Sequence, residues 1–487
     1  MKWACALILT LGCIVEASAD SDTQCRKLYR LTDLAYAVEP GRVVPAEGTV
    51  PRHCRVRAVV NRAIQVEVTM PTEGWNGRFM FSTVGGAAGT IGDVRSLLAR
   101  GFAMASTDTG HEVAEGFDFM NQPEALLDYA YRGVHLATQF AKQAVHTYYD
   151  RDIDFAYLKG CSNGGRAALM EAVRFPTDYD GIIAGAPAFR FQEFVPWMTE
   201  VARYQTRGPL TEEALQVLDD ASRAACDSLD GVVDGVISDP RRCTEDIYDV
   251  DQLACKVGQT QGCLTKGQIE TARFIYSDQL DAFGNVVSPG VLPGAEAAGD
   301  WAMWMLPNDL LGSGDESIIS DIGESLKVML RRDPSFNLAK FDTSNDREML
   351  DDMASYMDVQ TADLSEFRAR GGKLIMYQGW NDWPLRPQRA IDYLAAAEGA
   401  NGGVAETGGF FRLFTVPGMV HCAQGPGAWL ADYVDPLVTW RESDKAPETI
   451  TALQPEQGFS RPLCVYPKLT KYKGRGDVNR EQSFECK

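Results

Sequence analysis

The alternation of strands and helices between Trp75 and Ala188 constrains the fold of this 487-residue chain more than any other feature. Short apolar stretches predict strands, and the segments between them have the apolar spacing of a helix. The order strand, helix, strand is typical of a mostly parallel sheet with helices on both faces. The predicted strands are Arg78–Val84, Phe102–Thr107, Asp154–Leu158 and Gly181–Gly185, and the predicted helices are Tyr129–Tyr149 and Arg166–Phe175.

The pattern changes after Ala188. Residues 189–364 are acidic, contain four cysteines and show no regular alternation, so we expect a large insertion there. Two further core strands follow, at Gly372–Tyr377 and Phe410–Val416. A chain of this length exceeds the usual size of one hydrophobic core. The simplest organisation is one α/β core, built from residues 20–188 and 365–487 and interrupted by the insertion; a separate C-terminal domain is the alternative, although it leaves the late strands without a sheet.

Residues 1–19 have the pattern of a signal peptide. Lys2 supplies the positive end, Ala4–Val15 is uncharged and mostly apolar, and Ala17-Ser18-Ala19 is a small-residue cleavage site. A buried N-terminal element and a lipoprotein anchored at Cys13 are the alternatives. No other segment reaches the 18 apolar residues needed to span a bilayer. We therefore expect an exported protein, secreted or periplasmic.

The formal net charge of −20 would repel phosphate backbones and anionic lipid surfaces, so we expect no nucleic-acid or membrane partner. Ten cysteines remain after residue 19, and an even number in an exported chain indicates disulfides. Their spacing lacks the paired C-x-x-C of zinc sites. Neither their pairing nor the oligomeric state can be read from these residues.

Gly160-Cys161-Ser162-Asn163-Gly164 fits the G-x-S-x-G pattern of a nucleophile elbow. A predicted strand precedes it and a predicted helix follows, which is the setting that this motif needs. Ser162 would then lie at a helix N-terminus, where the N–H of Asn163 can face a developing oxyanion. A glycine-rich connection without chemistry is the alternative.

A serine hydroxyl needs a neighbouring base, and His421 is the best candidate because it follows a predicted strand late in the chain. His111 is a second candidate. Cys161 directly precedes Ser162, and Cys422 directly follows His421. If these cysteines are bonded, their Cα atoms lie within about 4.4–6.8 Å, which would hold the serine and the histidine close together.

The third catalytic side chain should be a carboxylate at the end of a core strand. Asp382 follows the strand GKLIMY and completes the order Ser, Asp, His that is typical of α/β-hydrolases. Its rivals are Asp351, Asp352 and Asp358. For the second oxyanion donor, Gly86 is favoured over Gly85 in the loop VGGAAG, which follows an early core strand.

An acidic loop, DSLDGVVDGVISD, carries Asp227, Asp230 and Asp234 within a few residues of each other. Carboxylates and backbone carbonyls suit a hard cation such as calcium, which takes six to eight oxygen ligands. The EF-hand spacing is absent, and a solvated acidic turn is the alternative.

In seven sequence strings, written out at the end of this paragraph, the chain resembles the tannase and feruloyl esterase family. This family includes the bacterial mono(2-hydroxyethyl) terephthalate hydrolases. The resemblance runs over most of the chain after residue 19, with long strings in the same order. Its glycine loop is less glycine-rich than the run usual in the family. The strings are WNGRF, ASTDTGH, DYAYRGVH, GCSNGGRAALMEAVRFPTDYDGIIAGAPA, GWNDWPLRP, PGMVHC and RPLCVYPKLTKYKGRGD.

The resemblance implies an α/β-hydrolase fold with a triad of Ser162, Asp382 and His421, while the oxyanion donors Gly86 and Asn163 are predicted from the residues alone. It implies that residues 189–364 are a lid domain with a structural calcium ion on Asp227, Asp230 and Asp234 and the carbonyls of Val232 and Val236. No organic cofactor is implied. The implied disulfides are Cys25–Cys54, Cys161–Cys422, Cys226–Cys243, Cys255–Cys263 and Cys464–Cys486.

The resulting hypothesis is a secreted serine esterase that cleaves a small aromatic ester through an acyl-enzyme intermediate. Trp301 and Trp304 are candidate substrate contacts because aromatic rings stack on phenolic or terephthalic-type acyl groups, although both could be ordinary lid core. One alternative is a serine peptidase of the prolyl-oligopeptidase type, but the propeller repeats of such enzymes are absent. The other is an exported binding protein that keeps the fold without turnover.

Overall fold

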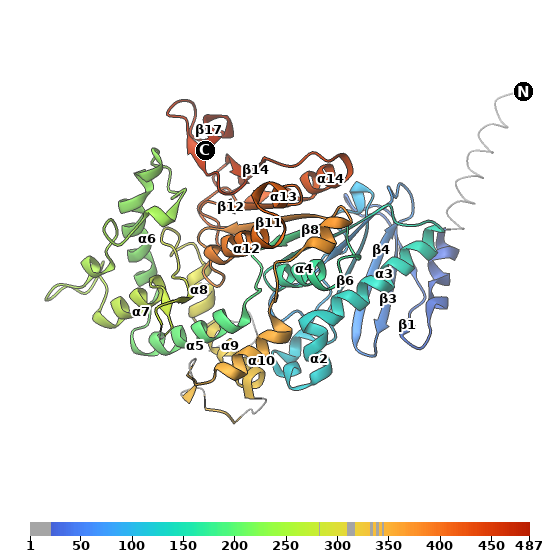
Figure 1. Ribbon diagram of the computed structural model, residues 1–487, viewed down its shortest axis with the longest axis horizontal. Coiled ribbons are helices and arrows are strands. Elements are labelled where there is room, and N and C mark those ends of the chain that lie inside the picture. The colour runs from blue at the N-terminus through green and yellow to red at the C-terminus, as the bar shows by residue number, and fades with distance from the viewer. Residues whose placement is uncertain (1–20, 282, 309–316, 332–334, 338–339, 343–344) are drawn as a thin grey trace, which may run out of the picture.

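The computed structural model describes residues 21–281, 283–308, 317–331, 335–337, 340–342 and 345–487. The predicted signal peptide lies outside the described residues. A ten-stranded sheet crosses the molecule, with strand order β1-β3-β4-β6-β5-β7-β8-β11-β12 and with β2 paired to β3 (Figure 1). Its strands are β1 Tyr36–Val38, β2 Arg42–Val44, β3 His53–Val60, β4 Ile64–Pro71, β5 Arg78–Ser82, β6 Ala103–Thr107, β7 Phe155–Cys161, β8 Gly181–Gly185, β11 Lys373–Gly379 and β12 Phe411–Val416.

From β6 to β12 every neighbouring pair in the sheet is parallel. The first four strands add an antiparallel edge. All residues of β6 and β8 are buried, as expected for strands covered on both faces, and such strands are continuous apolar runs in the sequence. The predicted mostly parallel sheet is therefore confirmed.

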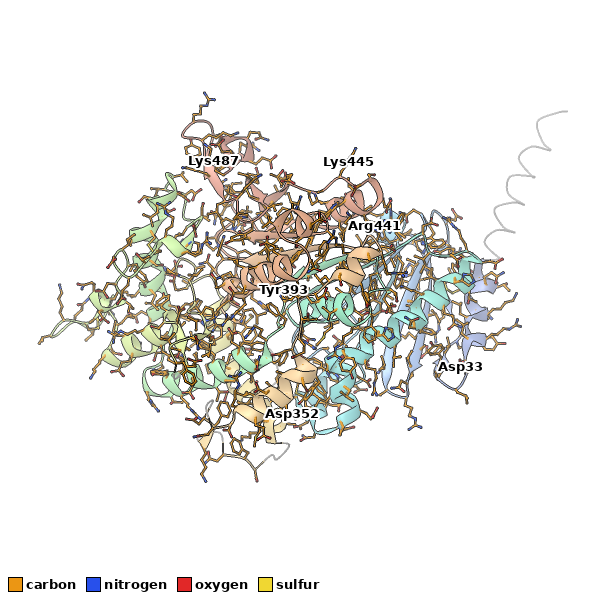
Figure 2. All side chains as sticks on the ribbon, in the orientation of Figure 1. Asp33, Asp352, Tyr393, Arg441, Lys445 and Lys487 are labelled. Carbon is orange, nitrogen blue, oxygen red and sulfur yellow. A yellow bond between two sulfur atoms is a disulfide. The ribbon has the colours of Figure 1, made fainter. Side chains whose placement is uncertain are left out.

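Helices cover both faces of the sheet (Figure 1). On one face α3, α4 and α12 share a hydrophobic core with β5, β7 and β8, and Tyr393, labelled in Figure 2, is part of this layer. On the other face α14 packs on β8 and β11. These helices are α3 Gly133–Tyr149, α4 Asn163–Arg174, α12 Pro387–Ala400 and α14 Val434–Ser443; shorter ones are α2 Pro123–Leu127, α11 Ser365–Ala369 and α13 Val404–Gly408.

Helices dominate the described part of the chain between β8 and β11, and they lie to the left of and below the sheet in Figure 1. They share a second hydrophobic core, which also takes in Trp383 from the loop after β11. β11 pairs with β8 and β12 pairs with β11, so the late strands belong to the same sheet as the early ones. The helices are α5 Phe191–Arg207, α6 Glu212–Cys226, α7 Lys266–Tyr276, α8 Asp300–Met305, α9 Ile318–Arg331 and α10 Arg347–Met357, with a hairpin of β9 Gln279–Leu280 and β10 Val286–Ser288.

Two small antiparallel sheets complete the C-terminal part: β13 Leu430–Ala431, β14 Thr449–Gln454 and β15 Phe459–Cys464, and β16 Thr470–Tyr472 with β17 Phe484–Cys486. The structure contains five disulfides, and their pairs are those that the family resemblance implies. Among the described residues, no helix is both long and apolar enough to cross a membrane.

Candidate active site

The carboxyl ends of three parallel strands bring Ser162, Asp382 and His421 together. Ser162 directly follows β7, whereas Asp382 and His421 lie in the loops after β11 and β12. β7, β8, β11 and β12 are successive neighbours in the sheet and run in the same direction. Their ends therefore meet at one edge of the sheet, which is where open α/β sheets place their ligands.

The turn at Ser162 has the strained backbone of a nucleophile elbow. Ser162 has φ 62° and ψ −125°, a conformation that residues with a Cβ rarely adopt. Its N–H donates to the Gly185 carbonyl at 3.0 Å, and its carbonyl accepts from Ala188 N–H at 3.0 Å. These bonds fix the turn against the end of β8. Such strain persists only where the surrounding structure holds it in place, and it is typical of active sites.

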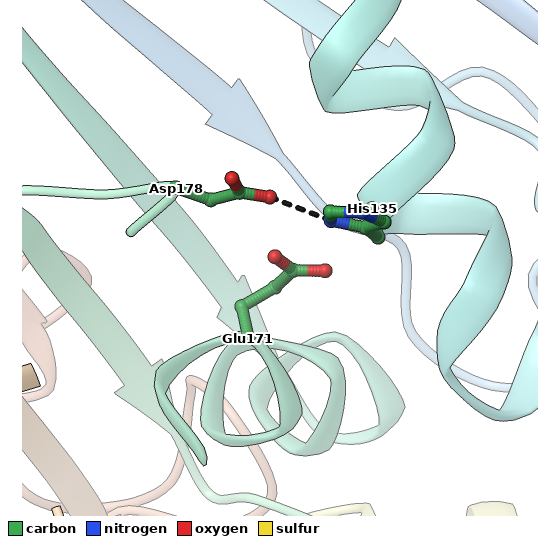
Figure 3. Close-up of side chains that lie close together, drawn as sticks. All are labelled: His135, Glu171 and Asp178. Carbon is green, nitrogen blue, oxygen red and sulfur yellow. Dashed lines mark hydrogen bonds and ion pairs between the residues drawn. The ribbon is translucent and has the colours of Figure 1, made fainter. Parts of the chain in front are cut away.

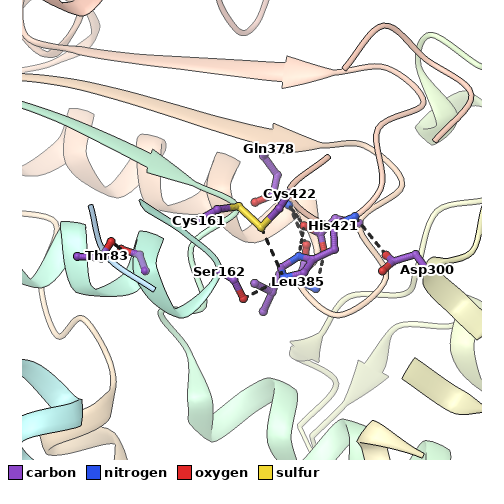
Figure 4. Close-up of a disulfide and its surroundings, with 10 residues drawn as sticks. Thr83, Cys161, Ser162, Asp300, Gln378, Leu385, His421 and Cys422 are labelled. Atoms are coloured by element: carbon purple, nitrogen blue, oxygen red, sulfur yellow. Dashed lines mark hydrogen bonds and ion pairs between the residues drawn. A yellow bond between two sulfur atoms is a disulfide. The ribbon is translucent and has the colours of Figure 1, made fainter. Parts of the chain in front are cut away.

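The three side chains form a hydrogen-bonded chain, of which Figure 4 labels Ser162 and His421. The Ser162 hydroxyl donates to His421 Nε2 over 2.9 Å, and His421 Nδ1–H donates to Asp382 Oδ2 over 3.0 Å. These distances fall in the range that a base needs to remove a serine proton. The geometry is that of a Ser–His–Asp triad, with the histidine tautomer assigned from the acceptor at Nδ1.

Asp382 is held by Gln378 of β11 and by Leu385 of its own loop. Gln378 Nε2 donates to Oδ2 at 2.8 Å, and Leu385 N–H donates to Oδ1 at 2.9 Å. Burial alone would lower the pKa of His421, but the charge of Asp382, its hydrogen bond and the charge of Asp300 together raise that pKa. A raised pKa favours the imidazolium that forms when His421 takes a proton.

Asp300 is a second buried carboxylate beside the histidine, and the sequence analysis did not identify it. Its Oδ2 accepts the backbone N–H of Trp383 at 3.0 Å and that of His421 at 3.3 Å. Its Oδ1 accepts the indole N–H of Trp304 at 3.0 Å. Figure 4 shows Asp300 on the side of His421 away from Ser162.

The disulfide Cys161–Cys422 joins the loops that carry Ser162 and His421 (Figure 4). Its Cα atoms are 6.0 Å apart, and 261 positions separate the two cysteines in the sequence. It therefore links the end of β7 to the loop after β12 directly at the site. The sequence suggests this bond, because the two cysteines are the direct neighbours of Ser162 and His421.

Gly86 and Asn163 line the same cavity as Ser162. Arg166, which is fully buried, donates through Nε and Nη2 to the Asn163 side-chain oxygen at 2.9 and 2.6 Å and so fixes this residue. The Tyr129 hydroxyl donates to the Gly86 carbonyl at 2.9 Å. Gly85 is also close, since a Cβ on it would lie 3.6 Å from Ser162 Cβ. Both glycines are thus near the nucleophile, and the choice between them as oxyanion donor stays a prediction.

The cavity above Ser162 is mainly apolar and aromatic. The glycine loop, the first turn of α4, the helices α5 and α9 and the loop after β11 all contribute to it. None of its described lining residues is Lys, Arg, Asp or Glu. They are Gly86, Phe117, Tyr129, Ser162, Asn163, Ala188, Phe191, Phe194, Val195, Met198, Trp304, Ile322, Ser325, Met329, Pro384, Leu385 and His421.

The structure brings Trp304 but not Trp301 to this cavity. The Trp304 ring lies edge-on to His421, with ring centroids 5.8 Å apart. Trp301 is 1% exposed and packs against Tyr276 and Trp383 inside the second hydrophobic core. The two rings thus have different surroundings, although residues three positions apart are neighbours on the surface of a helix.

The rival candidates lie elsewhere. His111 Nε2–H donates to the Ala87 carbonyl at 2.6 Å, and burial lowers the pKa of this histidine. Asp351 and Asp352 are exposed on α10, and Figure 2 shows Asp352 at the outer rim of the molecule. The Asp358 carboxylate accepts the N–H of Phe191 at 2.6 Å, at the start of α5. None of these four is bonded to Ser162 or His421 in the described contacts.

The acidic loop offers carboxylate and backbone carbonyl oxygens, which are the ligands that calcium prefers. The carboxylates of Asp227 and Asp230 accept backbone N–H groups of their own loop. Burial is the main cause that raises the pKa of both, hydrogen bonds from the loop oppose it, and the charge of Asp234 adds a smaller increase. Asp234 Oδ2 accepts from Arg461 at 2.6 Å, so one positive charge is already present. A bound cation would neutralise the remaining negative charge.

Among the described residues, a compact group of potential metal ligands occurs at His135, Glu171 and Asp178 instead (Figure 3). His135 Nδ1–H donates to Asp178 Oδ2 at 2.7 Å. Burial, the charge of Asp178 and a hydrogen bond with it raise the pKa of Glu171 well above its usual value. Lys142 also donates to the Asp178 carbonyl. Burial and the charge of Asp178 thus favour the protonated form of Glu171 in this cluster.

Comparison with known proteins gives a consistent result. The family model described as "Tannase and feruloyl esterase" matches residues 48–487. The chain is 30% identical to the mono(2-hydroxyethyl) terephthalate hydrolase of Piscinibacter sakaiensis, over 90% of this chain and 85% of that protein. It is 29% identical to the probable feruloyl esterase B-1 of Aspergillus flavus, over 89% of this chain and 86% of that protein.

The fold is also shared with a solved structure. The crystal structure of feruloyl esterase B from Aspergillus oryzae matches with a TM-score of 0.83 and 24% identity, over 96% of this chain and 100% of that chain. At this identity the likeness concerns the fold, which the parallel sheet and its flanking helices already define. Together with the family match over most of the sequence, it follows that this chain belongs to the tannase and feruloyl esterase family.

Proposed function

We propose that this carboxylic ester hydrolase cleaves esters of aromatic acids, with Ser162 as nucleophile, His421 as general base and Asp382 as the carboxylate that orients it. The observation that carries the proposal is the hydrogen-bonded chain from Ser162 Oγ through His421 to Asp382 at the end of an aromatic cavity. The strained turn at Ser162 and the disulfide beside it add to this support.

In the proposed reaction, Ser162 Oγ attacks the ester carbonyl carbon while His421 Nε2 takes the hydroxyl proton. The N–H groups of Asn163 and Gly86 stabilise the oxyanion, and each such donor is typically worth about 3–4 kcal/mol. The C–O bond to the alcohol then breaks, and His421 returns the proton to the leaving oxygen. Water attacks the acyl-enzyme by the same route, with His421 as base again, and releases the acid and free Ser162.

The walls of the cavity favour an uncharged aromatic acyl group. Phe117, Phe191, Phe194 and Trp304 offer ring faces and edges to a planar acyl group. Among the described lining residues none could neutralise a carboxylate on the acyl group, and burying an unpaired carboxylate is unfavourable. The relatives named above are a mono(2-hydroxyethyl) terephthalate hydrolase and a probable feruloyl esterase. Of these two substrate types, we propose the ferulate-like, uncharged acyl group for this chain.

A substrate panel and active-site labelling test this proposal. Methyl ferulate should have a higher kcat/KM than mono(2-hydroxyethyl) terephthalate, and Ser162→Ala should abolish both activities and labelling by a fluorophosphonate. A preference for the charged substrate would refute the proposed acyl specificity. Hydrolysis of a proline-linked anilide instead would favour the peptidase alternative, and folded protein that neither turns over nor becomes labelled would favour the binding protein.

Two further properties are part of the proposal. We propose that the chain is exported, because five disulfides are typical of oxidising compartments and the first nineteen residues have the pattern of a signal peptide. We also propose a structural calcium ion held by Asp227, Asp230 and Asp234 and the carbonyls of Val232 and Val236. Bound there, calcium would supply charge neutralisation and cross-link the loop, with no part in the chemistry.

A further inference from the structure

Asp300 is a buried carboxylate that the proposed reaction does not use, although it contacts the machinery of the site. It is 3% exposed and begins α8 in the lid. Its two oxygens accept hydrogen bonds from the backbone of Trp383, the backbone of His421 and the indole of Trp304. Trp383 directly follows Asp382 in the sequence. Asp300 therefore binds the loop that carries Asp382 and also the loop that carries His421.

Helix capping does not explain this carboxylate. The first residues of a helix often accept N–H groups of their own first turn, but the backbone N–H groups that Asp300 accepts come from outside α8. Its third partner, Trp304, lies one turn along α8 and lines the cavity beside His421. Through these contacts Asp300 connects α8 with the loop of Asp382, with the backbone of His421 and with Trp304 in the cavity wall.

The charge of Asp300 also faces His421. All three of its hydrogen-bond donors are neutral groups, and the charged neighbours that act on it are His421 and Asp382. Burial raises the pKa of Asp300 to about 6, while the charge of His421 lowers it and that of Asp382 raises it. Asp300 in turn raises the pKa of His421, in addition to the larger effect of Asp382.

We propose that Asp300 is a positioning residue through which the lid fixes the loops of Asp382 and His421 and stabilises the protonated histidine. This inference rests on the proposed function of His421 as the base. During acyl transfer His421 becomes an imidazolium, and a second carboxylate nearby in a buried site lowers the energy of that state. A lid that moves away would remove this charge and the Trp304 wall together.

Asp300→Asn is the central test because an asparagine oxygen can still accept the two backbone N–H groups while the charge is lost. The matched control is Glu296→Gln, another buried lid carboxylate, whose partners are Ser222, Tyr276 and the Gly294 N–H. The pKa of His421 is measured by NMR on protein labelled with 13C at the histidine Cε1 positions, with His421→Ala for assignment. The pH profile of kcat/KM for methyl ferulate is measured beside it.

In Asp300→Asn we expect the pKa of His421 to fall, the acidic limb of kcat/KM to move to lower pH and the plateau to drop about 10-fold, which corresponds to about 1.4 kcal/mol of lost transition-state stabilisation. Glu296→Gln should leave the His421 titration unchanged. If Asp300→Asn does not fold, Asp300→Ser removes the same charge with a smaller side chain.

The two hypotheses fail in distinguishable ways. An unchanged His421 titration in both Asp300 variants, with wild-type esterase activity present, would overturn the role of Asp300 alone. Wild-type protein without esterase activity or labelling at Ser162 would overturn the proposed function, and the NMR titration would still decide whether Asp300 acts on His421.

Discussion

At the scale of single residues, the nucleophile turn depends on glycines that leave room for neighbouring backbone. A Cβ on Gly160 would collide with Thr83 Oγ1 and lie 2.5 Å from the Gly164 carbonyl oxygen. Thr83 itself donates to the carbonyls of Lys159 and Gly164, and so joins the strand to the first turn of α4. Tight packing around the elbow therefore fixes the backbone conformation of Ser162.

Gly160→Ala should consequently displace Ser162 and lower kcat/KM by about 100-fold, since a shift of about 1 Å from the reactive geometry can have an effect of that size. Gly399→Ala is the matched control, because a Cβ there meets nothing within 4 Å in α12. It should retain full activity and gain about 0.5–1 kcal/mol of stability from helix propensity. Equal kcat/KM for the two variants would refute the role assigned to close packing.

The sequence indicates these residues to different degrees. Ser162 and His421 can be predicted because a short motif and a neighbouring cysteine mark each of them. Asp300 could not be predicted, since its partners become neighbours only when the lid packs on the loops after β11 and β12. A spacing of four positions between Asp300 and Trp304 is the only local signal. Trp301 and Trp304 could not be ranked, because a helix of six residues has no periodicity to show which side is buried.

At the scale of elements, the disulfides differ in what they connect. Cys161–Cys422 joins the end of β7 to the loop after β12 at the site, whereas Cys255–Cys263 closes a short loop between α6 and α7. In the chain-entropy view, stabilisation grows with loop length, from about 2–3 kcal/mol for the short loop to about 5 kcal/mol for the long one. The Cys161–Cys422 bond additionally fixes the distance between Ser162 and His421.

We therefore expect Cys161→Ala with Cys422→Ala to lower kcat at least about 10-fold under conditions where circular dichroism shows a folded protein. Cys255→Ala with Cys263→Ala should lower the Tm while leaving kcat close to wild type. Both double variants are compared at the same fraction folded. A common loss of stability with no difference in kcat would show that the first disulfide acts only on stability.

The acidic loop is an element whose stability should depend on calcium. Asp230→Asn removes one charge and one proposed ligand, and its Oδ1 can still accept the Val232 N–H. Calcium should raise the Tm of wild-type protein, EDTA should reverse this increase, and both effects should be smaller in Asp230→Asn. Asp281→Asn, in the exposed β9–β10 hairpin, serves as the control. A Tm that is indifferent to calcium and EDTA would exclude the ion.

Elements were predictable where burial leaves a simple pattern. The parallel strands β5 to β8 and β11 to β12 follow from apolar runs, and their bounds differ from the prediction by few residues. The helix predicted at Tyr129–Tyr149 begins with a π turn at Asp128–Arg132 before α3. The antiparallel strands β3 and β4 were not predicted, because the polar residues Arg55, Arg57 and Glu67 interrupt them and form ion pairs across the sheet.

At the scale of the whole molecule, several carboxyl groups are buried without a full charge partner. Burial raises the pKa of Asp358 to about 7 and that of Asp108 to about 6, and Asp300 behaves in the same way. Each value exceeds the unfolded pKa of about 3.9, so the folded state binds these protons more tightly. The stabilisation that these three carboxyl groups give to the folded state is complete below about pH 4. It is lost as the pH rises through 6 to 7.

His111 opposes this sign between pH 5 and 8, because burial lowers its pKa, but it is one group against three carboxyl groups. Burial would raise the pKa of Asp93, but hydrogen bonds from Ser96, Arg95 and Lys159 lower it, so Asp93 acts only below this window. The net charge of −20 increases the self-repulsion of the folded state as protons are lost. The free energy of unfolding should therefore be larger at pH 5 than at pH 8, by a few kcal/mol.

This prediction is checked by urea unfolding between pH 4.5 and 8 at fixed calcium concentration. Asp358→Asn should flatten the dependence, because asparagine does not titrate and its oxygen can still accept the Phe191 N–H. Asp352→Asn, exposed on the neighbouring helix α10, should keep the wild-type slope. Stability that rises from pH 5 to 8, or equal slopes in the two variants, would show that buried carboxyl groups do not set the pH response. Asp300 contributes to the same response because protonation favours its buried state, whereas its proposed action on His421 uses the ionised carboxylate and should therefore weaken as the pH falls through about 6.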